Sequence, residues 1–270
     1  MNKIVIITGA SSGIGLSLKN LYLSNGDIVY NISRSTVNDE YNYSCDVSNE
    51  EGIKRIIDEI GTKHGHIDIL INCAGFGVSG AMELTKTEDY DSIMATNVKG
   101  VFLTCKYAIK YMKEYSQIIN ISSTCALFAV PFRGLYCASK SAVSMYSYSL
   151  RMELRDSKIN VLTVCPGEVK TNFTKNRVKN FETNDRYNRK IADASYAIDR
   201  KDGKRMSSDK VAKKIYKLSL KKKTKPMVII SFKMKVLYFF QKFLPTRFWL
   251  YITEKTMGGH KKFDDNPYLK

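Results

Sequence analysis

Tyr136 and Lys140 stand four residues apart in the stretch LYCASK, and this pair could carry out proton chemistry. Positions i and i+4 lie on the same face of a helix. A free tyrosine has a pKa near ~10, and a nearby ammonium favours the phenolate and lowers that pKa. The pair could therefore act as a general acid and base. Taken alone, the pattern more often marks a surface tyrosine beside a solvated lysine, so its surroundings must decide.

Two further polar residues could join the pair. Ser123 ends the apolar run QIINISS (117–123) and lies 13 residues before Tyr136. If that run is a strand, Ser123 lies at the carboxyl edge of a sheet, where α/β folds bind their ligands. Asn97, within TNVKG (96–100), lies in the middle of a long helical pattern, where helix propensity does not favour asparagine.

A glycine-rich stretch, TGASSGIG (8–15), stands between an apolar run and a helical pattern. Glycines there allow a tight turn and let phosphate oxygens approach the backbone amides, and the helix N-terminus adds a positive dipole end. It is not a Walker A loop, because no Gly-Lys-Ser/Thr follows. A purely structural turn is the alternative. The candidate cofactor-binding residues of this loop are Gly9, Ser11, Ser12, Gly13, Ile14 and Gly15.

The end of the second apolar run should select the cofactor. Sites for NAD place an acidic residue there to bind the ribose diol. This chain has Ser33-Arg34-Ser35 at that point and no carboxylate. Arg34 can pair with a 2′-phosphate and stack on adenine, and Ser33 or Ser35 can donate a hydrogen bond. The sequence therefore favours NADP(H), with NAD(H) as the alternative, unless Arg34 is simply a solvated side chain.

Apolar, β-branched runs alternate with helical patterns along the chain, which predicts a single α/β domain with a doubly wound parallel sheet of the Rossmann type. The expected strands are 4–7, 27–33, one near 41–47, 68–75, 117–123, 160–167 and 226–231, and the expected helices are 14–24, 50–60, roughly 87–115, 136–155 and 208–220. The second crossover has only about a dozen residues, so we expect a turn or a very short helix there. We expect residues 1–231 to form the dinucleotide-binding and catalytic domain, and residues 232–270 to form a C-terminal extension.

Composition narrows the function further. The 270 residues carry a net charge of +17, but no zinc finger and no basic motif interleaved with aromatic residues, so we expect no nucleic-acid partner. The three histidines lack the spacing of metal ligands, and six cysteines without a CxxC pair predict reduced, buried thiols. No signal peptide and no membrane-spanning run is visible, which predicts a cytoplasmic protein.

Taken together, the motifs resemble the short-chain dehydrogenases/reductases of about 250 residues. The resemblance covers about residues 4–171, and its pieces occur in the order and spacing of the family. These pieces are TGASSGIG (8–15), CDV (45–47), NCAG (72–75), TNVKG (96–100), NISS (120–123), YCASK (136–140) and PGEVKT (166–171). Two features depart from the pattern: NCAG stands where the family often has NNAG, and the short second crossover removes surface near the adenine.

The resemblance implies hydride transfer between a nicotinamide and a carbonyl carbon, without a metal. Tyr136 would be the acid in reduction and the base in oxidation, and Lys140 would lower its pKa and bind the nicotinamide ribose. Ser123, favoured over Ser122 by the family spacing, would hold the substrate oxygen. Asn97 would help to place a water that relays protons to Lys140.

The resemblance also assigns a cofactor groove and an oligomer. The implied cofactor contacts are Asp46 and the Val47 backbone at the adenine, Asn72, Ala74 and Gly75 along the groove, and Pro166, Gly167, Val169 and Thr171 at the nicotinamide end. Dimers and tetramers are usual in the family, so we expect a homo-oligomer.

The substrate should be hydrophobic. Leu127, Phe128, Val130 and Phe132 follow Ser123 closely and either line a pocket or pack in the core. Residues 231–252 interleave aromatic and aliphatic residues with lysines, and Pro245 should divide them into two pieces. This extension could be a lid, a subunit interface or a membrane-surface element. Family members with such tails often act on steroids, bile acids, retinoids or long-chain lipid ketones.

Two rival functions remain on the same scaffold. One is a nucleotide-sensing regulator without catalysis, which we expect to lack the tyrosine or the lysine. The other is a membrane-surface lipid-binding protein with incidental reductase activity.

Overall fold

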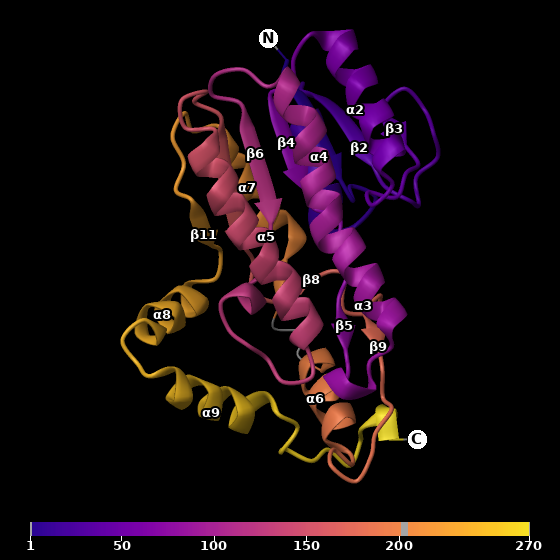
Figure 1. The fold of residues 1–270 in the computed structure, drawn as a ribbon, viewed down its shortest axis with the longest axis vertical. Coiled ribbons are helices and arrows are strands. Elements are labelled where there is room, and N and C mark those ends of the chain that lie inside the picture. The colour runs from indigo at the N-terminus through magenta and orange to yellow at the C-terminus, as the bar shows by residue number, and fades with distance from the viewer. Residues whose placement is uncertain (1, 201–204, 270) are drawn as a thin grey trace.

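Seven parallel strands form one central sheet in the computed structural model, which describes residues 2–200 and 205–269 (Figure 1). Their order across the sheet is β11-β7-β6-β4-β1-β2-β3. The strands are β1 (Ile4–Thr8), β2 (Ile28–Ile32), β3 (Asn42–Tyr43), β4 (Ile69–Asn72), β6 (Gln117–Ile121), β7 (Asn160–Cys165) and β11 (Met227–Ile229). This arrangement confirms the predicted doubly wound parallel sheet.

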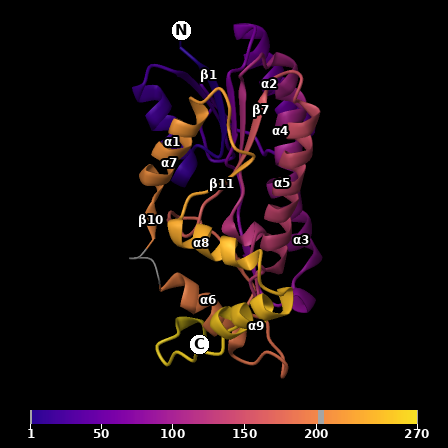
Figure 2. The same cartoon turned by 90° about the vertical axis from the view of Figure 1, so that its left-hand side faces the viewer.

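Helices cover both faces of the sheet, as Figure 2 shows from the side. On one face lie α1 (Gly13–Ser24) and α7 (Ser208–Ser219); on the other lie α2 (Glu50–His64), α4 (Gly100–Ala108) and α5 (Gly134–Glu153). Strand side chains alternate between the faces. Accordingly, Ile4 and Ile6 of β1 pack in one core cluster, and Val5 and Ile7 pack in the other.

The direction in which the chain winds reverses beside β1. From β1 the chain proceeds outward to β2 and β3 and then returns to β4 on the other side of β1. Such a reversal opens a crevice at the carboxyl ends of the strands, where open α/β sheets bind their ligands. The glycine-rich loop after β1 and the NCAG segment that begins in β4 meet at this crevice, since a Cβ on Gly9 would stand 2.8 Å from the Cα of Ala74.

The prediction of one helix over 87–115 was wrong in one respect, because the helical segment is not continuous. The chain forms α3 (Thr87–Met94), a π-helical turn (Ala95–Lys99), α4, and a 3-10 turn (Ile109–Tyr111). The crossover between β2 and β3 contains no helix, in agreement with the expected turn. Helix α6 (Lys190–Asp199) was not predicted, although Ile191, Ala194 and Ile198 recur at helical spacing on its buried face.

Two short strand pairs surround the carboxyl end of the sheet. β5 (Val78–Ser79) pairs with β9 (Val178–Lys179), and β8 (Val169–Lys170) pairs with β10 (Met206–Ser207). They connect the segment after β4 and the segment after β7 to later parts of the chain. The walls of the crevice are therefore fixed by backbone hydrogen bonds.

The C-terminal extension forms α8 (Phe232–Gln241) and α9 (Thr246–Met257) on the carboxyl-end side of the sheet (Figures 1 and 2). Pro245 immediately precedes α9, which confirms the predicted break. No helix in the described ranges is long and apolar enough to cross a membrane.

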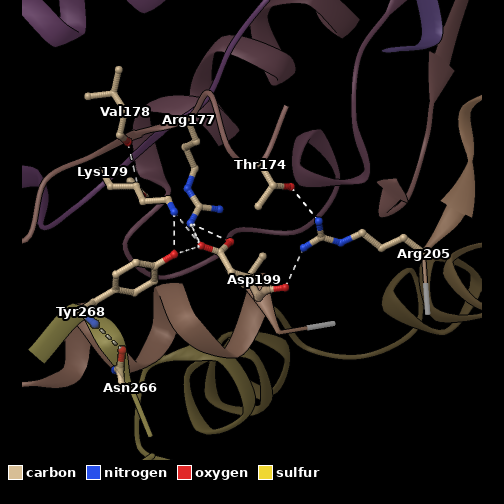
Figure 3. A network of polar contacts seen from close by, with 10 residues as sticks. Thr174, Arg177, Val178, Lys179, Asp199, Arg205, Asn266 and Tyr268 are labelled. Carbon is tan, nitrogen blue, oxygen red and sulfur yellow. Dashed lines mark hydrogen bonds and ion pairs between the residues drawn. The ribbon is translucent and has the colours of Figure 1, made fainter. Parts of the chain in front are cut away.

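A polar network fastens the end of the extension to the rest of the molecule (Figure 3). Asp199, at the end of α6, pairs with Arg177 at 3.2 Å and with Lys179 of β9 at 2.8 Å. The hydroxyl of Tyr268, near the C-terminus, donates to Asp199 at 2.6 Å. The extension is therefore held at both of its ends, because β11 anchors the other.

Candidate active site

Strand β6 and helix α5 bring together the three residues at the centre of the predicted site. Tyr136 and Lys140 lie in the N-terminal half of α5, and both are buried. The ammonium of Lys140 donates to the carbonyl of Ile121, the last residue of β6, at 2.9 Å. Two residues later, the buried hydroxyl of Ser123 hydrogen-bonds the Tyr136 side chain and accepts a hydrogen bond from the Cys125 amide at 3.1 Å. The structure thus places the serine, the tyrosine and the lysine in one buried group.

The Tyr136 phenol is protonated at neutral pH in this structure. Burial raises its pKa, the negative charge of a Cys125 thiolate raises it further, and the hydrogen bond with Ser123 and the charge of Arg133 lower it by less. The pKa is raised because desolvation of the phenolate outweighs the favourable charges. The lowering of this pKa by Lys140 stays a prediction.

Lys140 is itself perturbed by its surroundings. Burial lowers the pKa of its ammonium to about 8, against smaller opposing contributions from the Cys73, Cys165 and Cys125 thiols. A Cβ placed on Gly75 would stand 3.4 Å from the Lys140 Nζ atom. The lysine therefore reaches the floor of the crevice, immediately beside the NCAG segment.

Asn97 lies in the π-helical turn and is fully buried. Its Oδ1 accepts from the amide of Phe76 at 3.0 Å, and its Nδ2 donates to the carbonyl of the same residue at 2.9 Å. Nδ2 also donates to the hydroxyl of Ser139 at 3.0 Å. The asparagine side chain therefore clamps the chain after NCAG against α5, and this use explains an asparagine inside a helical segment. Its water-placing role stays a prediction.

The glycine-rich loop has the close packing that a phosphate cradle needs. A Cβ on Gly15 would stand 2.3 Å from the carbonyl oxygen of Gly9, and a Cβ on Gly13 would stand 3.2 Å from the Thr171 side chain. Gly9 and Gly13 have φ angles of 69° and 55°, which favour glycine. Ser12, the N-cap of α1, makes no capping bond with its side chain. The first amides of α1 can therefore serve an anion.

Arg34 stands at the adenine end with a largely exposed side chain. It contacts Asp46 only at 3.8 Å, whereas Asp46 accepts hydrogen bonds from the amide and hydroxyl of Ser48 at 2.8 and 2.7 Å. The Ser35 hydroxyl donates to Ser11 in the glycine-rich loop at 3.0 Å. Ser33 is buried, and its hydroxyl has no hydrogen-bond partner among the described residues. These groups fit a phosphate beside the adenosine, and no acidic residue occupies the position of Arg34.

Other residues of the predicted groove have structural contacts. The side chain of Asn72 belongs to a buried hydrogen-bond network, in which it accepts from the Thr104 hydroxyl at 2.7 Å and donates to the Asn120 side chain at 2.8 Å. Val47 packs against Gly100, where a Cβ would stand 2.6 Å from it. The side chains of Asn72 and Val47 therefore hold the scaffold, which leaves only their backbones for a ligand.

The segment after β7 closes the other side of the crevice. The carbonyl of Pro166 accepts from the amide of Thr124, just after Ser123, at 3.0 Å. Gly167 lies against Ser231, Val169 belongs to β8, and Thr171 reaches the glycine-rich loop. All four predicted residues of this segment therefore lie along one wall, between the buried serine and the phosphate cradle.

Comparison with known proteins decides the family. The family model described as short chain dehydrogenase matches residues 3–182. The chain belongs to the short-chain dehydrogenases/reductases. A relative from Helicobacter pylori, described as a probable short-chain type dehydrogenase/reductase, VdlC, is 32% identical over 267 residues and covers 95% of this chain and 98% of its own.

Two further relatives of this short-chain dehydrogenase/reductase are informative. A 3-ketodihydrosphingosine reductase from Bacteroides thetaiotaomicron is 38% identical over 180 residues, which cover 65% of this chain and 67% of the relative. The structure of ElxO with NADP bound has a TM-score of 0.68 and 27% identity, and the match covers 85% of this chain and 97% of that one.

Three residues that were not predicted from the sequence surround the tyrosine of this short-chain dehydrogenase/reductase. The Arg133 guanidinium lies 5.4 Å from the centre of the Tyr136 ring, and the Phe173 ring lies 5.6 Å from it. A hydrogen bond from Cys137 is the largest of the effects that lower the pKa of the Cys125 thiol to about 6. Arg133 and Cys125 could have been found from their proximity to Ser123 and Tyr136 in the sequence, whereas Phe173 carries no such signal.

A cavity of about 460 Å³ lies between the extension and the chain that follows Ser123. Residues 126–129 form one wall, and α8 and α9 contribute Tyr238, Trp249 and Leu250. Of the four apolar residues predicted for a substrate pocket, Leu127 and Phe128 line this cavity, Val130 is buried, and Phe132 packs on Tyr187. The Cys137 thiol, next to Tyr136, contacts the carbonyl of Phe128 at 3.8 Å, so the cavity wall adjoins α5.

In the described part of the chain, no three histidine, cysteine or acidic side chains gather as metal ligands would. All six cysteines are free thiols.

Proposed function

We propose that the protein is an NADP(H)-dependent oxidoreductase that interconverts a ketone and a secondary alcohol on a hydrophobic substrate. The observation that carries the proposal is the burial of Ser123, Tyr136 and Lys140 in one group beside a phosphate-binding glycine loop. Membership of the short-chain dehydrogenases/reductases and a relative with bound NADP support it.

Tyr136 is the proton donor in the reducing direction. Because burial raises its pKa, the phenol carries its proton at neutral pH and can deliver it to the substrate oxygen. The Ser123 hydroxyl lies beside the phenol and hydrogen-bonds the same oxygen. In oxidation the roles reverse, and Tyr136 takes the proton from the alcohol.

Lys140 supplies positive charge and a proton route behind the tyrosine. Its pKa of about 8 leaves it mostly charged at pH 7, and its position next to Gly75 places it at the crevice floor. Asn97 is a positioning residue, because its side chain holds the backbone of Phe76 and thereby the segment that carries Gly75. We include its water-placing role in the proposal.

The cofactor is held by the loop and the adenine end described above. The amides at the start of α1 face the pyrophosphate, and Arg34 with Ser33 and Ser35 faces a 2′-phosphate. When bound, the nicotinamide supplies or accepts the hydride at the substrate carbon. The remaining contacts proposed for it are Asp46, Val47, Asn72, Ala74 and Gly75, with Pro166, Gly167, Val169 and Thr171.

The cavity next to α5 supports a hydrophobic substrate. Its lining includes Leu127, Phe128, Trp249 and Leu250, with few charged groups. A relative named as a 3-ketodihydrosphingosine reductase supports a long-chain lipid ketone as the first class to test.

The test compares the wild type with Tyr136→Phe. NADPH and NADH are titrated separately by fluorescence, and turnover is then measured on ketones of increasing chain length, together with steroid and retinoid ketones. We expect both proteins to bind NADPH with similar affinity, and only the wild type to turn over a long-chain ketone.

Other outcomes would count against parts of the proposal. A preference for NADH would overturn the cofactor choice. Turnover by Tyr136→Phe at the wild-type rate would overturn the role of the tyrosine. Tight NADPH binding without turnover of any substrate would instead favour a nucleotide-sensing regulator.

A further inference from the structure

Helix α8 carries large apolar residues on its outer face, although only its inner face touches the rest of the protein. Its inner face places Tyr238 and Gln241 on the cavity wall, and the Gln241 amide donates to the carbonyl of Leu127 at 3.0 Å. Its outer face carries Phe232, Val236 and Phe239, spaced at i, i+4 and i+7 and therefore in one stripe. A helix of a globular protein normally carries charged or polar residues on its outer side.

The outer aromatic side chains remain in solvent. Phe232 is 79% exposed, Phe239 is 58% exposed and Phe243, just after the helix, is 71% exposed. The rings of Phe239 and Phe243 lie 5.1 Å apart, so they form a cluster. In α9, Tyr251 is 60% exposed. Single exposed apolar residues are ordinary, but a contiguous group marks an interaction site.

Basic side chains border this apolar surface. On the helix, Lys233 and Lys235 project on opposite sides of the phenylalanine stripe. Arg247 and Lys255 add two positive charges along α9, whereas Lys242, just after α8, lines the cavity and lies over the Tyr238 ring at 5.0 Å. Among residues 2–200 and 205–269, no ion pair joins Lys233, Lys235 or Arg247 to a carboxylate, whereas the charge of Lys255 acts on Glu254. The one acidic residue of α8 and α9, Glu254, is paired with His260.

The surface is also held in a defined position. β11 leads directly into α8, and the Tyr268 network fixes the chain after α9 (Figure 3). Figure 2 shows α8 and α9 lying across the carboxyl-end side of the molecule. The two helices therefore form a thin layer with the cavity on one side and the exposed aromatic residues on the other.

We propose that the outer face of α8 and α9 docks on the surface of an anionic lipid bilayer. The aromatic cluster enters the boundary between headgroups and acyl chains, and the flanking lysines and arginine contact the acidic headgroups. The cavity behind the two helices then lies next to the membrane, in a position to receive a lipid. The docking surface is independent of the reaction proposed above, because no group of the active site takes part in it.

Vesicle binding tests this docking with the full-length chain. Vesicles of phosphatidylcholine alone and vesicles with about 30% phosphatidylserine are compared by co-sedimentation at 0.1 and 0.5 M NaCl. Trp249 is the sole tryptophan and lines the cavity from α9, so quenching of its fluorescence by brominated lipid reports a lipid that reaches the cavity, and co-sedimentation reports docking of the outer face. We expect binding to the anionic vesicles that weakens about tenfold or more at the higher salt concentration.

Surface variants make the test specific. The triple variant Phe232→Ser, Phe239→Ser and Phe243→Ser should lose at least about tenfold in vesicle binding, since it removes exposed rings without touching the core. Leu23→Ser, Tyr90→Ser and Leu220→Ser form the control, because these large apolar residues are also exposed and lie away from the extension, on α1, on α3 and just after α7. The control should bind as the wild type does.

Two results would overturn the proposal. One is a wild type that stays in the supernatant with anionic vesicles at 0.1 M NaCl. The other is a phenylalanine triple variant that sediments normally but changes from an oligomer to a monomer in light scattering, because the surface would then be an interface between two copies of this chain. Neither result depends on turnover, so a failure of the proposed reaction is distinguishable from a failure of docking.

Discussion

The ammonium of Lys140 donates a 2.9 Å hydrogen bond to the carbonyl of Ile121 at the end of β6, in a site where burial lowers the pKa of the lysine to about 8. The unfolded chain holds its lysine proton up to a pKa of about 10.4. As the pH falls from about 10.4 to about 8, the unfolded state therefore gains protons that the folded state does not. Below pH about 8 the lysine is charged in both states, and its burial then lowers the free energy of unfolding. The same charge is the one proposed to assist Tyr136.

Replacing this lysine should stabilise the protein and abolish its activity. We expect Lys140→Met to raise the free energy of unfolding by about 2 kcal/mol at pH 7, since about 1.4 kcal/mol per pKa unit is recovered and one hydrogen bond is lost. The gain should shrink at pH 9.5, where the wild-type lysine is mostly neutral in the fold. Urea unfolding at both pH values without added cofactor measures this. Lys213→Met, at an exposed position of α7, is the control and should change little.

Gly15 offers a test of the phosphate cradle. An alanine there would place its Cβ 2.3 Å from the Gly9 carbonyl oxygen, so the loop must move. We expect Gly15→Ala to weaken NADPH binding by at least about a hundredfold, because the amides would no longer converge on the pyrophosphate. Gly26→Ala separates this effect from general strain, since Gly26 has a φ of 82° but no atom within 4 Å. Unchanged NADPH binding in Gly15→Ala would contradict the assignment of this loop.

Arg34 should determine the choice between the two cofactors. Its side chain is free to meet a 2′-phosphate, because its one ion-pair contact is long, at 3.8 Å from Asp46. We expect Arg34→Asp to weaken NADPH binding by about tenfold to a hundredfold and to improve NADH binding. Separate titrations of the two cofactors measure the change. Arg155→Ala, at an exposed site beyond α5, should leave both affinities unaltered.

The main elements of this site could be predicted from the sequence, because the patterns that indicate them are local. Strand alternation, the glycine-rich loop and the four-residue spacing of Tyr136 and Lys140 each depend on neighbours in the chain. The Pro245 break was predictable for the same reason. The π-helical turn at Asn97 was not, because it depends on a clamp between Asn97 and Phe76, which lies 21 residues away.

Electrostatic effects at the site also escaped prediction. The pKa of Tyr136 depends on how deeply the phenol is buried and on Arg133 and Cys125 around it, and a one-dimensional pattern contains neither burial nor distance. Phe173 reaches the Tyr136 ring from a segment with no apolar periodicity. Helix α6 was missed too, and one of its buried residues, Asp193, is held by a hydrogen bond from Asn266 in the distant C-terminal segment.

Asp199 connects α6, β9 and the C-terminus, and its ionisation should govern how firmly the extension is attached. Burial disfavours the charged carboxylate, but hydrogen bonds from Lys179 and Tyr268 and the charge of Arg177 outweigh that effect and leave the pKa of Asp199 below its ordinary value. A lowered folded pKa means that the stabilisation is fully present above the unfolded pKa of about 3.9 and is lost as the pH falls through the folded value.

We therefore expect Asp199→Asn to lack at pH 7 the stabilisation that the wild type loses in acid. Removing the carboxylate leaves Arg177 and Lys179 without their counter-charge, at a cost of roughly 3 kcal/mol. Limited proteolysis should then cleave the extension faster, and urea unfolding should report the lost stability. Tyr268→Phe should have a smaller effect, because the ring can still stack on Phe181, 4.7 Å away. Equal protease resistance of Asp199→Asn and the wild type at pH 7 would show that the attachment does not depend on this carboxylate.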